Sequence, residues 1–197
     1  RLSIGIIGGG IGGVAFAVAL SRDSQLDVQL FEAAPQFSEI GAGVSFGPNA
    51  VTAIQRLGLE APYQRIADSS PAPFEDVWFE WRRGSDDTYL TASLAPGVGQ
   101  SSVHRADFLD AIVANLPEDI AHFGKRCIGV KQGTDSATAS FDDGTHFTGD
   151  VIIGFDGIKS AVRPHVLPPE QYGEITPFWS GTYAYRGMIP TRDLRLL

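Results

Sequence analysis

The sequence predicts an α/β fold built on a parallel sheet, and three observations near its start support this. Leu2–Ile7 is a short apolar run suited to a buried strand, and a G-x-G-x-x-G pattern follows it over 8–13. An apolar helix of mostly small residues is expected over 14–20, and a second strand over 28–31 that ends in Glu32. Strand, helix and strand in this order form the βαβ unit of parallel sheets.

Each glycine of the pattern has a mechanical role if this unit binds a dinucleotide. Gly8 permits a tight turn out of the strand, Gly10 lets a diphosphate approach the backbone, and Gly13 lets helix and strand pack closely. The helix N-terminus presents free N–H groups and a partial positive charge to the phosphates. Glu32 follows Gly8 by 24 residues, close to the expected spacing of about 20, and can accept hydrogen bonds from a ribose diol.

Two other interpretations of this stretch compete with the dinucleotide site. In an ordinary βαβ unit the glycines would only shape a turn, and the acid at the end of the second strand would be incidental. A secretory signal peptide would share the apolar run, but the six glycines from Gly5 to Gly13 would weaken its helix. The pattern also continues into a second strand, so the dinucleotide site is the favoured interpretation.

The composition argues against several classes of protein. The 197 residues are 43% hydrophobic and 19% charged, as in globular proteins, and the net charge of −8 argues against a nucleic-acid partner. Cys127 is the only cysteine, so no internal disulfide and no zinc cluster are expected, which fits a reducing cytoplasm. No apolar run reaches the roughly 18–20 residues of a membrane span. Because the chain starts directly on a strand, we expect further residues at both ends.

The segment after the βαβ unit combines a loop, a helix and a hairpin. The glycine-rich stretch 39–49 predicts a loop whose backbone could lie against a flat ligand, and a helix over 48–57 follows it. Strands over 76–81 and 88–92 predict a hairpin that belongs to a different layer. Arg82, at its turn, is a candidate for contact with an anionic substrate, although a solvated turn explains it better.

A second helix is expected to begin at His104–Arg105–Ala106–Asp107 and to end before Pro117. Arg105 lies at its N-terminus, where a cation is unfavourable for the helix dipole, so either an anionic partner or an ordinary surface position explains it. A three-stranded meander and a buried parallel strand should follow, and we place His122 and His146 in the meander rather than in any chemistry. The strands are expected over 121–123, 127–132, 137–141, 146–148 and 151–155.

The last motif, G-F-D-G-I-K-S-A-V-R, follows the buried parallel strand. Asp156 comes at the carboxyl end of that strand, where ligands bind in open α/β sheets, and it could also cap the next helix. Gly157 gives the turn, and a short helix is expected over 160–163. The aromatic stretch 178–189 predicts the first strand of a new sheet, and its Arg186 is a candidate for holding an anion or for a structural ion pair.

Together, the glycine pattern with Glu32, the His104–Asp107 motif and D-G-x-x-S-x-x-R resemble the flavoprotein aromatic hydroxylases, which are single-component FAD monooxygenases. In that family the first motif binds the ADP part of FAD and the second supplies an arginine to the flavin. The third touches FAD and is implicated in binding the nicotinamide coenzyme, which implies Arg163 as an NADH contact; Arg82 and Arg186 are substrate candidates. The cofactor residues implied are Gly8, Gly10, Ile11, Gly13, Glu32, Ala33, Gly43, Val44, Arg105, Asp156 and Gly157.

The resemblance also implies an architecture. A Rossmann-like FAD-binding domain with a three-stranded β-meander would comprise 1–75 and 98–168. Residues 76–97 and 169–197 would begin a mixed-sheet substrate domain. One departure is Phe155, which stands where the family usually has a small residue, and this should affect packing more than chemistry.

Four longer segments, among them F-E-A-A-P-Q-F-S-E-I-G-A-G-V-S-F-G-P-N-A, resemble members of the family that act on salicylate. This implies a cytoplasmic enzyme that hydroxylates and decarboxylates salicylate to catechol with bound FAD, NADH and O2, without metal, nucleic acid or membrane. The oligomeric state is left open. So are three alternatives: hydroxylation of a related hydroxybenzoate without decarboxylation, flavin binding without hydroxylase activity, and an NAD(P)-dependent dehydrogenase.

Overall fold

The computed structural model describes residues 1–38, 43–69, 71–167, 177–185, 189 and 191–194. Its centre is a parallel sheet with the strand order β11-β1-β2-β7. The strands are β1 (Leu2–Ile7), β2 (Leu26–Phe31), β7 (Ala121–His122) and β11 (Val151–Gly154). This order, in which the first strand lies between the second and the last, is that of a Rossmann-like half-sheet and confirms the predicted fold class.

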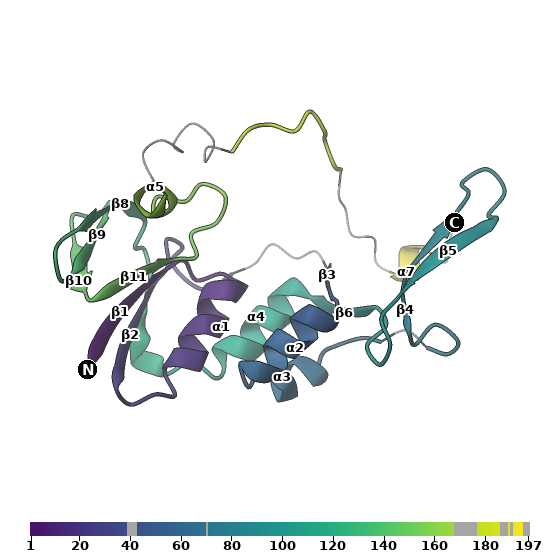
Figure 1. Cartoon of the computed structure of the whole chain (residues 1–197), viewed down its shortest axis with the longest axis horizontal. Helices are drawn as coiled ribbons and strands as arrows, with labels where there is room; N and C mark the ends of the chain where they lie inside the picture. The colour runs from purple at the N-terminus through teal and green to yellow at the C-terminus, as the bar shows by residue number, and fades with distance from the viewer. Residues whose placement is uncertain (39–42, 70, 168–176, 186–188, 190, 195–197) are drawn as a thin grey trace.

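Helices cover one face of this sheet (Figure 1). Helix α1 (Ile11–Leu20) connects β1 to β2 and packs against α4 (Arg105–Val113). Between the sheet and these helices lies the larger apolar core, because alternate residues of the strands point to this side. Its fully buried side chains include Ile6, Val14, Leu30, Phe108 and Ile112.

An antiparallel meander covers the other face. It consists of β8 (Cys127–Gln132), β9 (Ala137–Phe141) and β10 (His146–Gly149), in the order β10-β9-β8. Phe31 packs its ring against Phe141 and Phe147 of the meander, with centroids 4.8 and 5.0 Å away. The sheet is therefore buried on both faces, as parallel sheets usually are.

A smaller pair of strands carries the chain toward α4. Strand β3 (Gly43–Phe46) pairs antiparallel with β6 (Ser101–His104), and helices α2 (Pro48–Arg56) and α3 (Glu60–Gln64) lie beside them. The prediction of a loop over 39–49 is therefore wrong for 43–46, while 39–42 lie outside the described residues. A glycine-rich sequence gives no sign of the partner strand, which comes more than fifty positions later in the chain.

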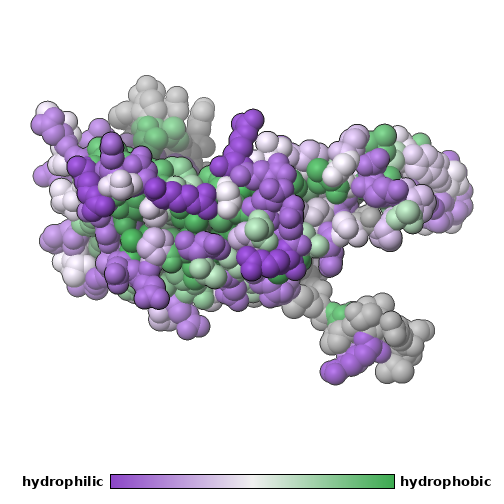
Figure 2. All heavy atoms as spheres, turned by 90° about the horizontal axis from the view of Figure 1, so that it is seen from below, coloured by the Kyte–Doolittle hydropathy of each residue, from purple (hydrophilic) through white to green (hydrophobic). Residues whose placement is uncertain are grey.

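The predicted hairpin is present as β4 (Val77–Arg82) and β5 (Tyr89–Leu94), and it projects from the body as an arm (Figure 1). Hydrophobic residues reach the surface of this arm (Figure 2), among them Trp81 and Leu94. The remaining elements are a 3-10 turn, η1 (Glu118–Ile120), and the short helices α5 (Arg163–Val166) and α7 (Thr191–Leu194). No helix in the described part of the chain is long and apolar enough to cross a membrane.

Three predictions made from the sequence are corrected. His122 belongs to the parallel sheet, where it pairs with Phe31 of β2, and not to the meander. The stretch 178–189 forms no strand over its described residues, because its aromatic side chains have no neighbouring strand there and Tyr185 is 97% exposed. Pro164 does not end a helix over 160–163 but lies in the first turn of α5, where a proline is tolerated.

Candidate functional site

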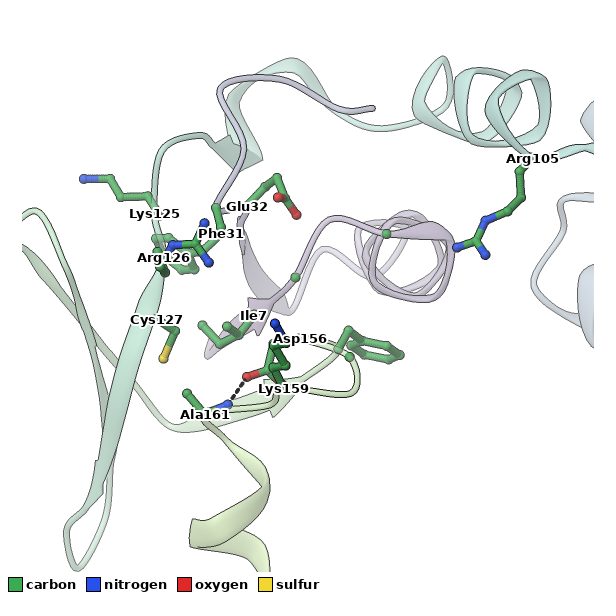
Figure 3. Close-up of a pocket in the computed structure, with 15 residues that line it drawn as sticks. Ile7, Phe31, Glu32, Arg105, Lys125, Arg126, Cys127, Asp156, Lys159 and Ala161 are labelled. Carbon is green, nitrogen blue, oxygen red and sulfur yellow. Dashed lines mark hydrogen bonds between the residues drawn. The ribbon is translucent and has the colours of Figure 1, made fainter. Parts of the chain in front are cut away.

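A cleft of about 380 Å³ opens where β1, β2 and β11 end at the same edge of the parallel sheet (Figure 3). Ligands bind at this edge in open α/β sheets, because the loops there diverge and helix N-termini point toward it. Of the residues predicted to bind a cofactor, the structure places these in the lining: Gly8, Gly10, Glu32, Ala33, Arg105, Asp156 and Gly157.

The glycine turn has the geometry that only glycine permits at two positions. Gly8 has φ +108°, and a β-carbon there would lie 2.4 Å from the carbonyl oxygen of Phe155. A β-carbon at Gly13 would lie 1.9 Å from the carbonyl oxygen of Gly8. The two glycines therefore let strand β1, the start of α1 and the end of β11 approach one another closely.

Helix α1 begins at this turn without a side-chain cap. Gly10 is its N-cap in an extended conformation, and no side chain accepts a hydrogen bond from the helix end there. The first N–H groups of a helix have no partners within the helix, so this end offers donors and a partial positive charge to the cleft. Ile11, the first helical residue, instead packs part of its side chain against the core.

Glu32 is held at the end of β2 by two backbone donors. Its Oε2 accepts a hydrogen bond from the Gly9 N–H at 2.6 Å, and its Oε1 accepts one from the Ala34 N–H at 2.7 Å. The carboxylate thus connects the end of β2 to the glycine turn while it lines the cleft. A carboxylate oxygen accepts more than one hydrogen bond, so this arrangement leaves acceptor capacity for a ribose.

Asp156 holds the turn after β11 in the same manner. Its Oδ1 accepts from the Ser160 hydroxyl at 2.5 Å, and its Oδ2 accepts from the N–H groups of Ala161 at 2.6 Å and Val162 at 3.2 Å. Gly157 gives the turn with φ +74°. Asp156 therefore caps the local turn and also faces the cleft, so the two interpretations of this residue are compatible.

Arg163 binds its own turn. Its guanidinium donates to the carbonyl oxygens of Gly157 at 2.8 Å and Ile158 at 3.0 Å. It lines a second, more open cavity of about 410 Å³ on the other side of Asp156. The structure thus places Arg163 next to the cleft that carries the glycine turn, but not in it.

Arg105 is the first residue of α4 and lines the cleft at the end far from Lys125 and Arg126 (Figure 3). His104, the N-cap of α4, pairs with Gly43, and Val103 pairs with Val44. Gly43 and Val44 thus lie beside the strand that leads to Arg105, and the structure does not bring them into the lining of the cleft.

Four polar residues that line the cleft were missed from the sequence: Lys125, Arg126, Cys127 and Lys159. Lys125 forms an ion pair with Asp143 at 2.6 Å, and Arg126 lies 3.8 Å from Asp142. Burial raises the pKa of the Cys127 thiol, which favours its neutral form at neutral pH. Lys159 could have been noticed as a cation inside D-G-x-x-S-x-x-R. No sequence motif indicates that Lys125, Arg126 and Cys127 would line a cleft.

Of the two substrate candidates, the structure describes one, and it is not in the lining of this cleft. Arg82 lies on the hairpin and pairs with Glu80 at 3.0 Å and Asp87 at 2.9 Å, and these partners raise its pKa further. Arg186 lies outside the described residues. Among the described residues no group of histidine, cysteine and acidic side chains is arranged to hold a metal ion.

Comparisons with known proteins give relatives for most of the chain. A family model described as an NAD(P)-binding Rossmann-like domain matches residues 6–45. The chain is 60% identical over 98% of its length to a salicylate hydroxylase from Pseudomonas putida and spans 45% of that relative. It resembles the structure named "Salicylate hydroxylase substrate complex" with a TM-score of 0.74 and 48% identity, over 83% of this chain and 38% of that one.

A solved structure of Klebsiella pneumoniae HpxO complexed with FAD and uric acid is also similar. Its TM-score is 0.67 at 28% identity, over 83% of this chain and 41% of that one. The chain thus spans less than half the length of each of these proteins. The motifs predicted a resemblance to the FAD-dependent aromatic hydroxylases. The comparisons extend this resemblance to nearly the whole chain, with salicylate hydroxylase among the similar proteins.

Proposed function

We propose that the cleft binds FAD and that the protein containing this chain hydroxylates and decarboxylates salicylate to catechol, consuming NADH and O2. The observation that carries the proposal is the uncapped N-terminus of α1 above the Gly8 turn, with Glu32 beside it. The similarity to salicylate hydroxylase over 98% of the chain supports the choice of substrate.

The residues of the cleft fit the parts of FAD. The diphosphate is matched by the free N–H groups at the start of α1, and the close approach at Gly10 needs a residue without a side chain. Glu32 is placed to accept hydrogen bonds from the ribose of the adenosine half. Arg105 lines the same cleft from the side of α4 and would face the flavin half. When bound, FAD would accept a hydride from NADH and make O2 reactive toward an electron-rich ring.

This chain's own residues contribute binding and orientation. The turns held by Glu32 and Asp156 are fixed by backbone hydrogen bonds, which would keep the site in shape for a nucleotide. A preformed site loses less conformational entropy on binding, which strengthens the affinity. Arg163 is proposed as a contact for NADH, on the second cavity beside Asp156. Arg82 and Arg186 stay candidates for the carboxylate of the substrate.

The favoured cofactor is FAD rather than a nicotinamide dinucleotide alone, although the Rossmann-like unit serves both. Arg105 and the Asp156 turn extend the site beyond the βαβ unit. The similar HpxO structure contains FAD. We further propose that 1–75 and 98–168 form the FAD-binding domain, that 76–97 and 169–197 belong to a substrate domain, and that the enzyme works in the cytoplasm. The projecting hairpin β4–β5 supports this division.

Three measurements on the intact protein test the proposal. The purified protein should be yellow, salicylate should stimulate NADH oxidation under air, and catechol should be the product. NADH turnover with a hydroxylated acid that keeps its carboxylate would favour the hydroxybenzoate alternative. A flavin-bound protein without turnover on any phenolic acid would favour a binding protein, and a colourless protein that reduces NAD⁺ would favour a dehydrogenase.

A further inference from the structure

The cleft carries a local charge opposite to that of the whole chain. The protein has a net charge of −8, with 15 basic and 23 acidic residues. Among the described residues that line the cleft, four are cations and two are carboxylates. The cations are Arg105, Lys125, Arg126 and Lys159, and the carboxylates are Glu32 and Asp156. Such a concentration of positive charge in a concave site favours an anionic ligand.

Both carboxylates accept hydrogen bonds from backbone N–H groups around the cleft. Glu32 accepts from Gly9 and Ala34, and Asp156 accepts from Ala161 and Val162. Each is therefore held in place by local hydrogen bonds. The cationic side chains around them can attract a negatively charged ligand.

The cations of the cleft differ in how they are held. Lys125 is bound at 2.6 Å by Asp143 and at 2.9 Å by the Thr145 hydroxyl, and Arg126 faces Asp142. These acidic partners belong to the β9–β10 turn. For Lys159 the described part of the structure gives no ion pair and no hydrogen bond, and the residue is exposed in the cleft. Lys159 can therefore turn toward an arriving anion without breaking an existing pair.

The turn that carries Lys159 packs against the glycine turn. A β-carbon at Gly8 would lie 2.4 Å from the carbonyl oxygen of Phe155 and 2.9 Å from the nitrogen of Asp156, so the two turns are packed in direct contact. Lys159 lies three residues after Asp156, beyond the bend at Gly157. Figure 3 shows Lys159 beside Asp156, at the end of the strand that carries Ile7.

We propose that the Lys159 ammonium supplies countercharge to the diphosphate of the dinucleotide bound at the start of α1. The inference rests on the proposed function, because it takes FAD to be that dinucleotide. The helix N-terminus contributes partial charge and directed N–H groups, whereas Lys159 contributes a full charge on a flexible stem from the facing turn. Lys159 is thus a binding residue for the cofactor and takes no part in the oxidation itself.

The test measures FAD affinity, not turnover. The intact protein is stripped of flavin and titrated with FAD, followed by the change in flavin fluorescence, at low and at high salt. Lys159→Gln should weaken binding about tenfold at low salt, the low end for a lost charge-assisted hydrogen bond because the site is open to water. The loss should shrink at high salt, since added ions screen an exposed charge. Lys159→Arg, which keeps the charge, should restore most of the affinity.

Lys131→Gln is the matched control, since Lys131 is an exposed lysine on β8 outside the lining of the cleft. Its FAD affinity should equal that of the wild type at both salt concentrations. Equal FAD affinity of Lys159→Gln and wild type at low salt would overturn the assignment. A loss confined to NADH affinity, measured on the FAD-saturated protein, would also overturn it. Failure of the wild type to bind FAD would instead show that the proposed function is wrong.

Discussion

A β-carbon on Gly13 would lie 1.9 Å from the carbonyl oxygen of Gly8, which is less than any real contact allows. The first helix and the glycine turn therefore touch backbone to backbone. The position of α1 over the cleft depends on this contact, because Gly8 is also packed against the backbone after β11.

Gly13→Ala should displace α1 and weaken both folding and FAD binding. Overpacking a tight contact costs about 1–3 kcal/mol, and a backbone atom cannot turn away as a side chain can, so we expect the upper end. Gly12→Ala is the control, because its β-carbon would meet the ring of Phe155 at 3.1 Å, and a ring can shift. Thermal unfolding and FAD titration measure both effects, and equal effects of the two variants would contradict the contact.

Glu32→Ala removes the acceptor for two backbone N–H groups as well as the proposed ribose contact. Loss of a charge-assisted hydrogen bond costs about 1.5–3 kcal/mol, so FAD should bind at least about tenfold more weakly. Asp27→Ala, an exposed acid on the same strand, controls for the lost charge. If the dissociation constant of FAD were unchanged in Glu32→Ala, the ribose contact would have to be given up.

Asp156→Ala should loosen the turn after β11. The donors of Ser160, Ala161 and Val162 would lose their acceptor in a partly buried place. The free energy of unfolding should therefore fall by about 1–3 kcal/mol. Ser160→Ala removes one of these donors and should cost less. Denaturant titration of both variants gives the comparison, and a larger loss for Ser160→Ala would show that the hydroxyl, not the carboxylate, organises the turn.

The pair of Lys125 and Asp143 should make the meander sensitive to acid. Hydrogen bonds from Lys125 and Thr145 lower the pKa of Asp143 below its ordinary 3.8. A carboxyl with a lowered folded pKa stabilises the fold at pH values above its unfolded pKa, and this contribution is lost as the pH falls through the folded pKa. Asp143→Asn should therefore lower the unfolding temperature at pH 7 and make little difference in strong acid. A difference that does not shrink with falling pH would exclude the ion pair as its source.

The local parts of the fold could be predicted from the sequence, because their signals lie within a few residues of one another. The βαβ unit, the hairpin over the two tryptophans of β4 and the turn at Gly157 are examples. Pairings between segments that are distant in the chain could not be predicted. Examples are the pairing of β3 with β6 and that of His122 with β2. A two-residue strand such as β7 has no periodicity of its own, so its place depends on the sheet that receives it.

The candidate site follows the same division. Gly8, Glu32 and Asp156 carry local motifs, and all three line the cleft. Lys125 and Cys127 reach it only because the meander packs across the sheet, which no local pattern records. Arg82 lies on the hairpin, outside the lining of this cleft, and pairs there with Glu80 and Asp87.

The visible absorption spectrum of the intact protein, purified gently, tests the central claim most directly. Bound FAD at the Gly8 turn predicts flavin absorption bands, and their loss in Gly10→Val, whose side chain would occupy the space of the diphosphate. A wild-type protein without flavin bands that cannot take up added FAD, or a fully loaded Gly10→Val variant, would contradict the claim.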